Sequence, residues 1–128
     1  MLYTKGFLLA GALATALTLA ALAELPARPG SAGPALGADD LGALEHLGAA
    51  VDTHEFPRDR IQEPDFDMAQ AAHDAAELAS GRTRAALLRL ADAASRSALA
   101  FLVEYNLAAG GWESTCGVRM PAATPAAA

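Results

Sequence analysis

An uncharged run near the N-terminus does most to limit what this chain can fold into. Residues 6–23 read GFLLAGALATALTLAALA, eighteen residues without a charge, and follow the basic start MLYTK. As a helix the run would be about 27 Å long, slightly less than the roughly 30 Å hydrocarbon core of a bilayer. We therefore expect it to enter a membrane, as a signal peptide or as a single anchor, and not to join a water-soluble core.

The residues after this run leave both alternatives open. Ala21-Leu22-Ala23 has the small-x-small pattern of a leader peptidase site, and Glu24 ends the hydrophobicity at once. Against cleavage, the run is longer than the usual ~7–15 residues of a signal-peptide core. Lys5 before the run favours a cytoplasmic N-terminus. Either way the rest of the chain is predicted to be exported, into the periplasm or outside the inner membrane to which residues 6–23 would anchor it.

Composition divides the exported part into three segments. Residues 24–38, ELPARPGSAGPALGA, are rich in proline and glycine and are predicted to be a flexible tether. Residues 39–111 are predicted to form one small helical domain. Residues 112–128 form a C-terminal tail whose end, PAATPAAA, is of low complexity and is expected to be disordered.

Apolar residues at helical spacing predict the first two helices of the domain. The first is expected over residues 39–55, with acidic residues at its start and an end imposed by Pro57, which disfavours helix in the residue before it. The second is expected over residues 65–79, with Asp65 as a plausible N-cap after Pro64.

A third and longer helix is predicted over residues 82–107. Ser80-Gly81 separates it from the second helix, and Gly110-Gly111 is expected to end it. No stretch alternates in the manner of a strand. The predicted fold class is therefore all-α: an apolar leader or anchor helix, a tether, and a small three-helix domain whose last two helices form a helical hairpin.

The predicted core is thin, and this points to a partner. Leu, Ile, Val and Phe make up 17 of the 82 residues from Asp39 to Met120, so three helices of this kind would be marginally stable alone. The run ALAFLV, residues 98–103, has no polar side. Phe101 and Leu102 differ by about 100° around a helix, so we expect one of them to face outward and to contact another protein. We expect Trp112 either to anchor that contact or to fold back onto the core.

Histidines beside carboxylates suggest a divalent-metal site. His73 and Glu77 in HDAAE are one helical turn apart, and His54 lies near the end of the first helix, beside Asp52. Brought together, His54, His73 and Glu77 could bind zinc, copper or nickel. The alternative is an acidic, solvated surface with ordinary histidines, since no known metal-binding motif is present.

Cys116 is the single cysteine of the chain. A c-type haem needs C-x-x-C-H, which the chain lacks. In an exported protein, a lone cysteine is either a free or buried thiol or a partner in an intermolecular disulfide.

The remaining features exclude several classes of protein. A formal charge of −6 with no sizeable basic patch argues against nucleic-acid binding. No phosphate loop, nucleophile elbow or metalloprotease signature occurs, so neither an enzyme nor a cofactor-dependent protein is predicted. The sequence favours a non-enzymatic accessory or structural subunit that packs against a larger membrane or periplasmic protein. The alternative is a small periplasmic protein that binds a divalent metal.

Overall fold

The computed structural model describes residues 36–127, and this part of the chain is all-helical. It contains four α-helices, one short 3₁₀ turn (η1, Arg58–Arg60) and no strand within that range. None of its helices is long and apolar enough to cross a bilayer. The predicted leader or anchor and nearly all of the predicted tether lie outside the described residues.

The first two helices agree with the sequence prediction. Helix α1 spans Ala38–Thr53, and α2 spans Phe66–Leu78. Asp65 caps α2 as predicted, because its side chain accepts a hydrogen bond from the amide of Met68 at 3.1 Å. Asp40 has a role that the sequence did not indicate. Its carboxylate accepts a hydrogen bond from the amide of Ser80 at 2.9 Å, so the start of α1 is joined to the turn after α2.

The third predicted helix is two helices, which corrects the predicted count of three. Helix α3 spans Gly81–Arg96, and α4 spans Ala98–Cys116. Ser97 between them is extended, with φ −168° and ψ 154°, and its hydroxyl accepts a hydrogen bond from the amide of Ala100 at 3.0 Å. The side chain of Ser97 thus replaces a backbone acceptor in the first turn of α4, which allows the chain to reverse direction at a single residue.

The C-terminal end of α4 also differs from the prediction. Gly110 and Gly111 lie inside the helix, which continues to Cys116. Gly117 ends it in the left-handed conformation, with φ 72°, which glycine adopts at little cost. Trp112 falls in the added turn and packs into the core rather than facing outward.

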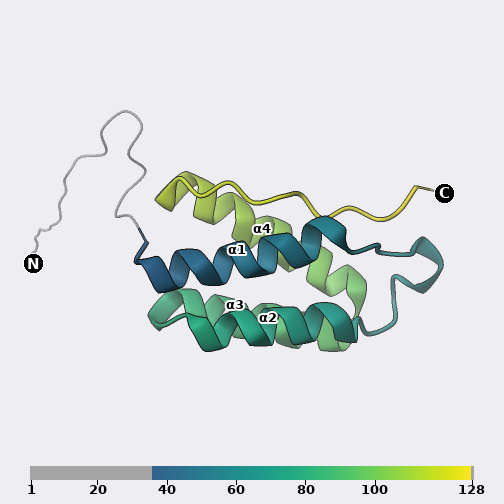
Figure 1. The fold of residues 1–128 in the computed structure, drawn as a ribbon. Coiled ribbons are helices and arrows are strands. Elements are labelled where there is room, and N and C mark those ends of the chain that lie inside the picture. The colour runs from purple at the N-terminus through teal and green to yellow at the C-terminus, as the bar shows by residue number, and fades with distance from the viewer. Residues whose placement is uncertain (1–35, 128) are drawn as a thin grey trace, which may run out of the picture. The chain divides into compact units, whose positions relative to one another are not determined.

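The four helices run alternately in opposite directions, and α2 lies beside both α1 and α3 (Figure 1). Three aromatic rings form the centre of the part of the core near the α1–α2 loop. Phe101 of α4 stacks on Phe56 of that loop, with ring centroids 6.0 Å apart, and on Tyr105, at 5.5 Å. Since alanine supplies much of the remaining core, these rings account for a large share of the buried apolar area.

The last residues are extended and lie against the helices, in place of the disordered end that their composition suggested. In Figure 1 the yellow C-terminal segment returns along α1 and α4. The phenolic hydroxyl of Tyr105 donates a hydrogen bond to the carbonyl of Pro121 at 2.6 Å. Low sequence complexity did not reveal this contact, because it involves the backbone of the segment and not its side chains.

Candidate functional site

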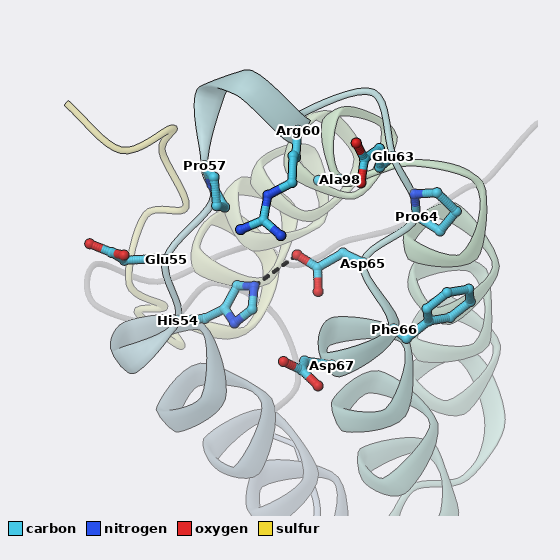
Figure 2. A pocket seen from close by; sticks show the side chains of 10 residues that line it. All are labelled: His54, Glu55, Pro57, Arg60, Glu63, Pro64, Asp65, Phe66, Asp67 and Ala98. Atoms are coloured by element: carbon cyan, nitrogen blue, oxygen red, sulfur yellow. Dashed lines mark hydrogen bonds and ion pairs between the residues drawn. The ribbon is translucent and has the colours of Figure 1, made fainter. Parts of the chain in front are cut away.

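A pocket of about 490 Å³ opens where α1 ends and α2 begins (Figure 2). Two prolines bend the connecting loop, and the 3₁₀ turn between them places Arg60 over the opening. Most of the residues that line the pocket are charged or polar: His54, Glu55, Pro57, Arg60, Glu63, Pro64, Asp65, Phe66, Asp67 and Ala98.

A histidine and an aspartate form a hydrogen-bonded pair in this pocket. Nε2 of His54 lies 2.8 Å from Oδ2 of Asp65, and the two side chains are only 19% and 10% exposed. Because a carboxylate only accepts, Nε2 carries the proton and donates it. The His54 ring also meets the edge of Phe56, with centroids 4.7 Å apart. The pair therefore joins the residue that follows α1, its C-cap His54, to the residue that precedes α2, its N-cap Asp65.

The loop that carries this pair also supports the start of α4. The carbonyl of Ile61 accepts a hydrogen bond from the amide of Leu99, and the carbonyl of Glu63 accepts one from Ala98, both at 2.8 Å. In the other direction, the amide of Asp65 donates to the carbonyl of Ala94 at 2.8 Å. The free amides at the start of α4 thus find acceptors in a loop more than thirty residues earlier in the chain.

An imidazole oriented by a carboxylate is the arrangement that general bases use. None of the ten residues that line this pocket has a hydroxyl or thiol group that such a base could activate. Asp65 uses one carboxylate oxygen for His54 and the other for the amide of Met68. Asp65 thus holds both His54 and the first turn of α2, and we call the His54–Asp65 pair the latch between α1 and α2.

The structure separates the three residues that were predicted to bind a metal. His54 lines the pocket described above, whereas His73 lines a different hollow between α2 and α3. The predicted neighbours His73 and Glu77 do face each other, with Nδ1 and Oε2 3.9 Å apart, on an exposed helix surface. Among residues 36–127 no group of three or more His, Cys, Asp or Glu side chains is placed to hold a metal ion.

The predicted partner-contact residues lie inside the domain. Phe101, Leu102 and Trp112 are 0%, 4% and 8% exposed. At 100° per residue, the five buried residues of α4 (Ala98, Phe101, Leu102, Tyr105 and Trp112) cover an arc of about 100°. Phe101 and Leu102 lie at the two borders of that arc, so both can be buried. The prediction that one of them would face outward assumed a buried arc narrower than 100°.

The exposed apolar residues of α4 are others, which the sequence analysis did not identify. Leu99, Val103 and Leu107 are 39%, 53% and 73% exposed. They recur at every fourth position and therefore follow one face of α4; we call this set the α4 stripe. Its period was present in the sequence, but the run from Ala98 to Val103 is apolar on all sides, so the pattern did not show which residues face outward.

Cys116 is a free thiol of intermediate exposure at the last turn of α4. Its sulfur lies 3.5 Å from the hydroxyl of Thr115. An intermolecular disulfide through Cys116 stays a prediction.

Tyr105 has an unusual proton affinity, and this leads to the first testable prediction. Burial, and secondly the charge of Asp52, raise the pKa of Tyr105 from 10.0 to about 12. The chain has two tyrosines, so in a Tyr3→Phe chain Tyr105 is the only one that remains. We expect the ultraviolet absorbance of its phenolate to appear near pH 12 in the folded protein and near pH 10 in strong denaturant.

The raised pKa also predicts how stability depends on pH. Because the folded state holds the phenolic proton more tightly than the unfolded state, this contribution is complete below about pH 10 and is lost as the pH rises towards 12. In Tyr105→Phe the same interval should give a flatter profile of unfolding free energy against pH. Titration of the folded phenol near pH 10 would contradict the burial argument.

Two surface features of the described residues are the pocket that contains the His54–Asp65 pair and the α4 stripe, whose side chains are 39–73% exposed. Comparisons with known protein families, with curated proteins and with solved structures give no match for this chain.

Proposed function

We propose that this chain is a non-enzymatic accessory or structural subunit, exported by its N-terminal run, that packs against a larger membrane or periplasmic protein. The observation that supports the proposal is the α4 stripe. A helix that is apolar on every side is typical of a helix surrounded by protein. On α4 the domain covers one side, and the stripe leaves the other side for a second protein.

The surroundings of the stripe support the same function. A hollow of about 280 Å³ lies beside it, between α3 and α4, and is lined by Ala86, Arg89, Leu90, Glu104, Leu107 and Ala108. An apolar side chain from a partner could enter this hollow against Leu90 and Leu107. Arg89 and Glu104 supply one positive and one negative charge beside the hollow. The partner would therefore need charged or polar groups that complement both, around an apolar centre, as interfaces commonly have.

The second testable prediction concerns capture of the partner. Replacing both Val103 and Leu107 by aspartate should reduce the affinity for the partner at least about 30-fold. Burial of each of these exposed aliphatic side chains on binding contributes roughly 1–2 kcal/mol to the binding free energy. Tagged full-length chain isolated from membranes in mild detergent would be compared with the variant, with the captured protein identified by mass. Helix content from circular dichroism should be unchanged.

A matched control uses the exposed apolar residues of another helix. Phe66 and Leu78 on α2 are also large and exposed, so Phe66→Asp with Leu78→Asp adds the same charges on α2. The control should retain the partner. A chain that purifies alone and is monomeric from its native membrane fraction would contradict the proposed function. Loss of the partner in both variants would contradict the assignment to the α4 stripe.

A further inference from the structure

Backbone hydrogen bonds hold the C-terminal segment to the rest of the domain, and its Val118, Met120 and Ala123 side chains pack against the core. Residues 117–127 follow α1 and α4 (Figure 1). The groups that hold them form a surface that we call the tail-binding surface: Gly48 of α1, Phe56 and Arg58 of the α1–α2 loop, and Tyr105 and Asn106 of α4.

Asn106 makes the most specific contact of this surface. Its side-chain amide donates to the carbonyl of Ala123 at 2.8 Å, and its side-chain oxygen accepts from the amide of the same residue at 3.1 Å. This reciprocal pair is what a neighbouring β-strand would offer to an extended chain. It requires a residue with an N–H at position 123 and therefore excludes proline there. Because Ala123 is buried in the core, it also excludes a large side chain.

A second contact selects the residue two positions earlier. Tyr105 donates to the carbonyl of Pro121 at 2.6 Å. On the other side of Pro121, a Cβ built on Gly48 would lie 3.3 Å from Cδ of the proline and 3.6 Å from the terminal methyl of Met120. The missing side chain at Gly48 thus leaves the space that the proline ring occupies.

A third contact fixes the end of the segment. The guanidinium Nε of Arg58 donates to the carbonyl of Ala126 at 2.7 Å, and the amide of Ala126 donates to the carbonyl of Phe56 at 2.9 Å. Five hydrogen bonds are therefore made to the backbone of the segment, at positions 121, 123 and 126. Any extended peptide with proline and small residues at this spacing can form all five.

We infer that the tail-binding surface is a recognition site for an extended peptide of the pattern Pro-x-Ala-x-x-Ala, which the chain's own C-terminal segment occupies in cis. The segment leaves α4 at Gly117, whose positive φ makes a sharp turn. Its docking uses backbone hydrogen bonds at positions 121, 123 and 126 together with a buried small side chain at Ala123, which is how domains that bind extended peptides obtain affinity and specificity. The same surface accepts this peptide in trans when the attached segment is absent from it.

Effective concentration sets the expected affinity. A segment attached by a short link competes at about millimolar effective concentration. Since the attached segment is docked, the free peptide should bind an open surface with a Kd below about 0.1 mM, and the wild-type chain should bind it at least about 10-fold more weakly.

The test uses full-length chain in mild detergent and a synthetic, fluorescent peptide with the sequence of residues 117–128. In Ala123→Arg the attached segment cannot enter its buried position, so this variant should bind the peptide. Ala123→Arg combined with Asn106→Ala should not bind it, nor should either chain bind a peptide that carries the same Ala123→Arg change. Absence of binding to folded Ala123→Arg at millimolar peptide would overturn the inference.

A second measurement covers the case in which Ala123→Arg fails to fold. Millimolar unlabelled peptide is added to isotopically labelled wild-type chain, and the amide signals of Ala123 and Ala126 are followed. Because the attached segment competes at about the same concentration, displacement should move roughly half of the intensity of both signals to the positions of a free peptide. The peptide with Ala123→Arg should leave both signals in place. Unchanged signals with both peptides would show that the segment is only a fixed part of the fold and would overturn the inference.

Discussion

Replacing Phe101 with alanine is expected to lower the free energy of unfolding by about 3–5 kcal/mol. Phe101 is fully buried and stacks on Phe56 on one side and on Tyr105 on the other. The change would remove the middle ring of the three and leave a cavity between two rigid neighbours. Denaturation in urea, followed by circular dichroism, measures the loss.

The composition of the core makes this loss large relative to the whole. Ten of the 21 buried hydrophobic residues are alanines, and alanine buries little area. The free energy of unfolding of a small domain is about 5–15 kcal/mol. A single large ring therefore contributes a large fraction of the free energy of unfolding, and the domain with Phe101→Ala should be partly unfolded at physiological temperature.

Leu107 is the matched control on the same helix. Its side chain is largely exposed, so Leu107→Ala should change the free energy of unfolding by less than about 0.5 kcal/mol. The two variants separate two roles that the sequence analysis combined. Phe101 acts through the core, and Leu107 acts on the proposed partner surface. A Phe101→Ala chain as stable as the wild type would contradict the placement of Phe101 at the centre of the aromatic stack.

Local signals in the sequence were enough to predict the all-α class and the first two helices. Asp65 follows a proline and precedes an apolar pattern, and it caps α2 as this arrangement indicates. Pro57 lies in the loop just after α1, which ends at Thr53, and it precedes η1. Each of these effects depends on residues within one or two turns, which a single sequence displays.

The break at Ser97 could not be predicted in the same way. Serine is common inside helices, and the flanking residues favour helix on both sides. The reversal is stabilised by the carbonyls of Ile61 and Glu63, which accept the first amides of α4 from a distant part of the chain. Such acceptors become known only when the fold is known. The docked C-terminal segment was missed for the same reason, since the groups that bind it lie on α1, α4 and the α1–α2 loop, far from it in the sequence.

The candidate site shows the same division. The pair of His73 and Glu77 follows from helical spacing, and the structure contains it. The pair of His54 and Asp65 spans a loop of ten residues, and the sequence placed His54 beside Asp52 instead. Both members of the actual pair were predicted to lie at helix ends. The two prolines that turn the loop were the available signal that these ends meet.

Replacing Asp65 with alanine is expected to lower the free energy of unfolding by about 2–4 kcal/mol, the second large effect. The change removes the N-cap of α2, worth about 0.5–2 kcal/mol, and leaves the ring of His54 without its acceptor, at a further cost of about 1–3 kcal/mol. Asp65→Asn keeps an acceptor for the amide of Met68 and should cost about half as much. Urea denaturation of the two variants provides the comparison.

The coupling between the two residues tests whether they form a latch. His54→Ala alone should cost less than Asp65→Ala, because the cap remains. The loss of unfolding free energy in the double variant should be smaller than the sum of the two single losses by about 1 kcal/mol or more, since both changes remove the same hydrogen bond. Strict additivity would mean that the 2.8 Å contact between Nε2 and Oδ2 contributes nothing to stability.

Asp65→Ala should also destabilise the start of α4, because the same loop contacts both the start of α2 and the start of α4. Asp65 positions the segment that offers the carbonyls of Ile61 and Glu63 to the amides of Leu99 and Ala98. When the latch opens, these acceptors move away and the first turn of α4 loses its partners. Hydrogen exchange at the amides of Ala98 and Leu99 should then accelerate more than exchange in the middle of α3. Equal acceleration throughout the domain would indicate global destabilisation, and the latch would then have no separate influence on the start of α4.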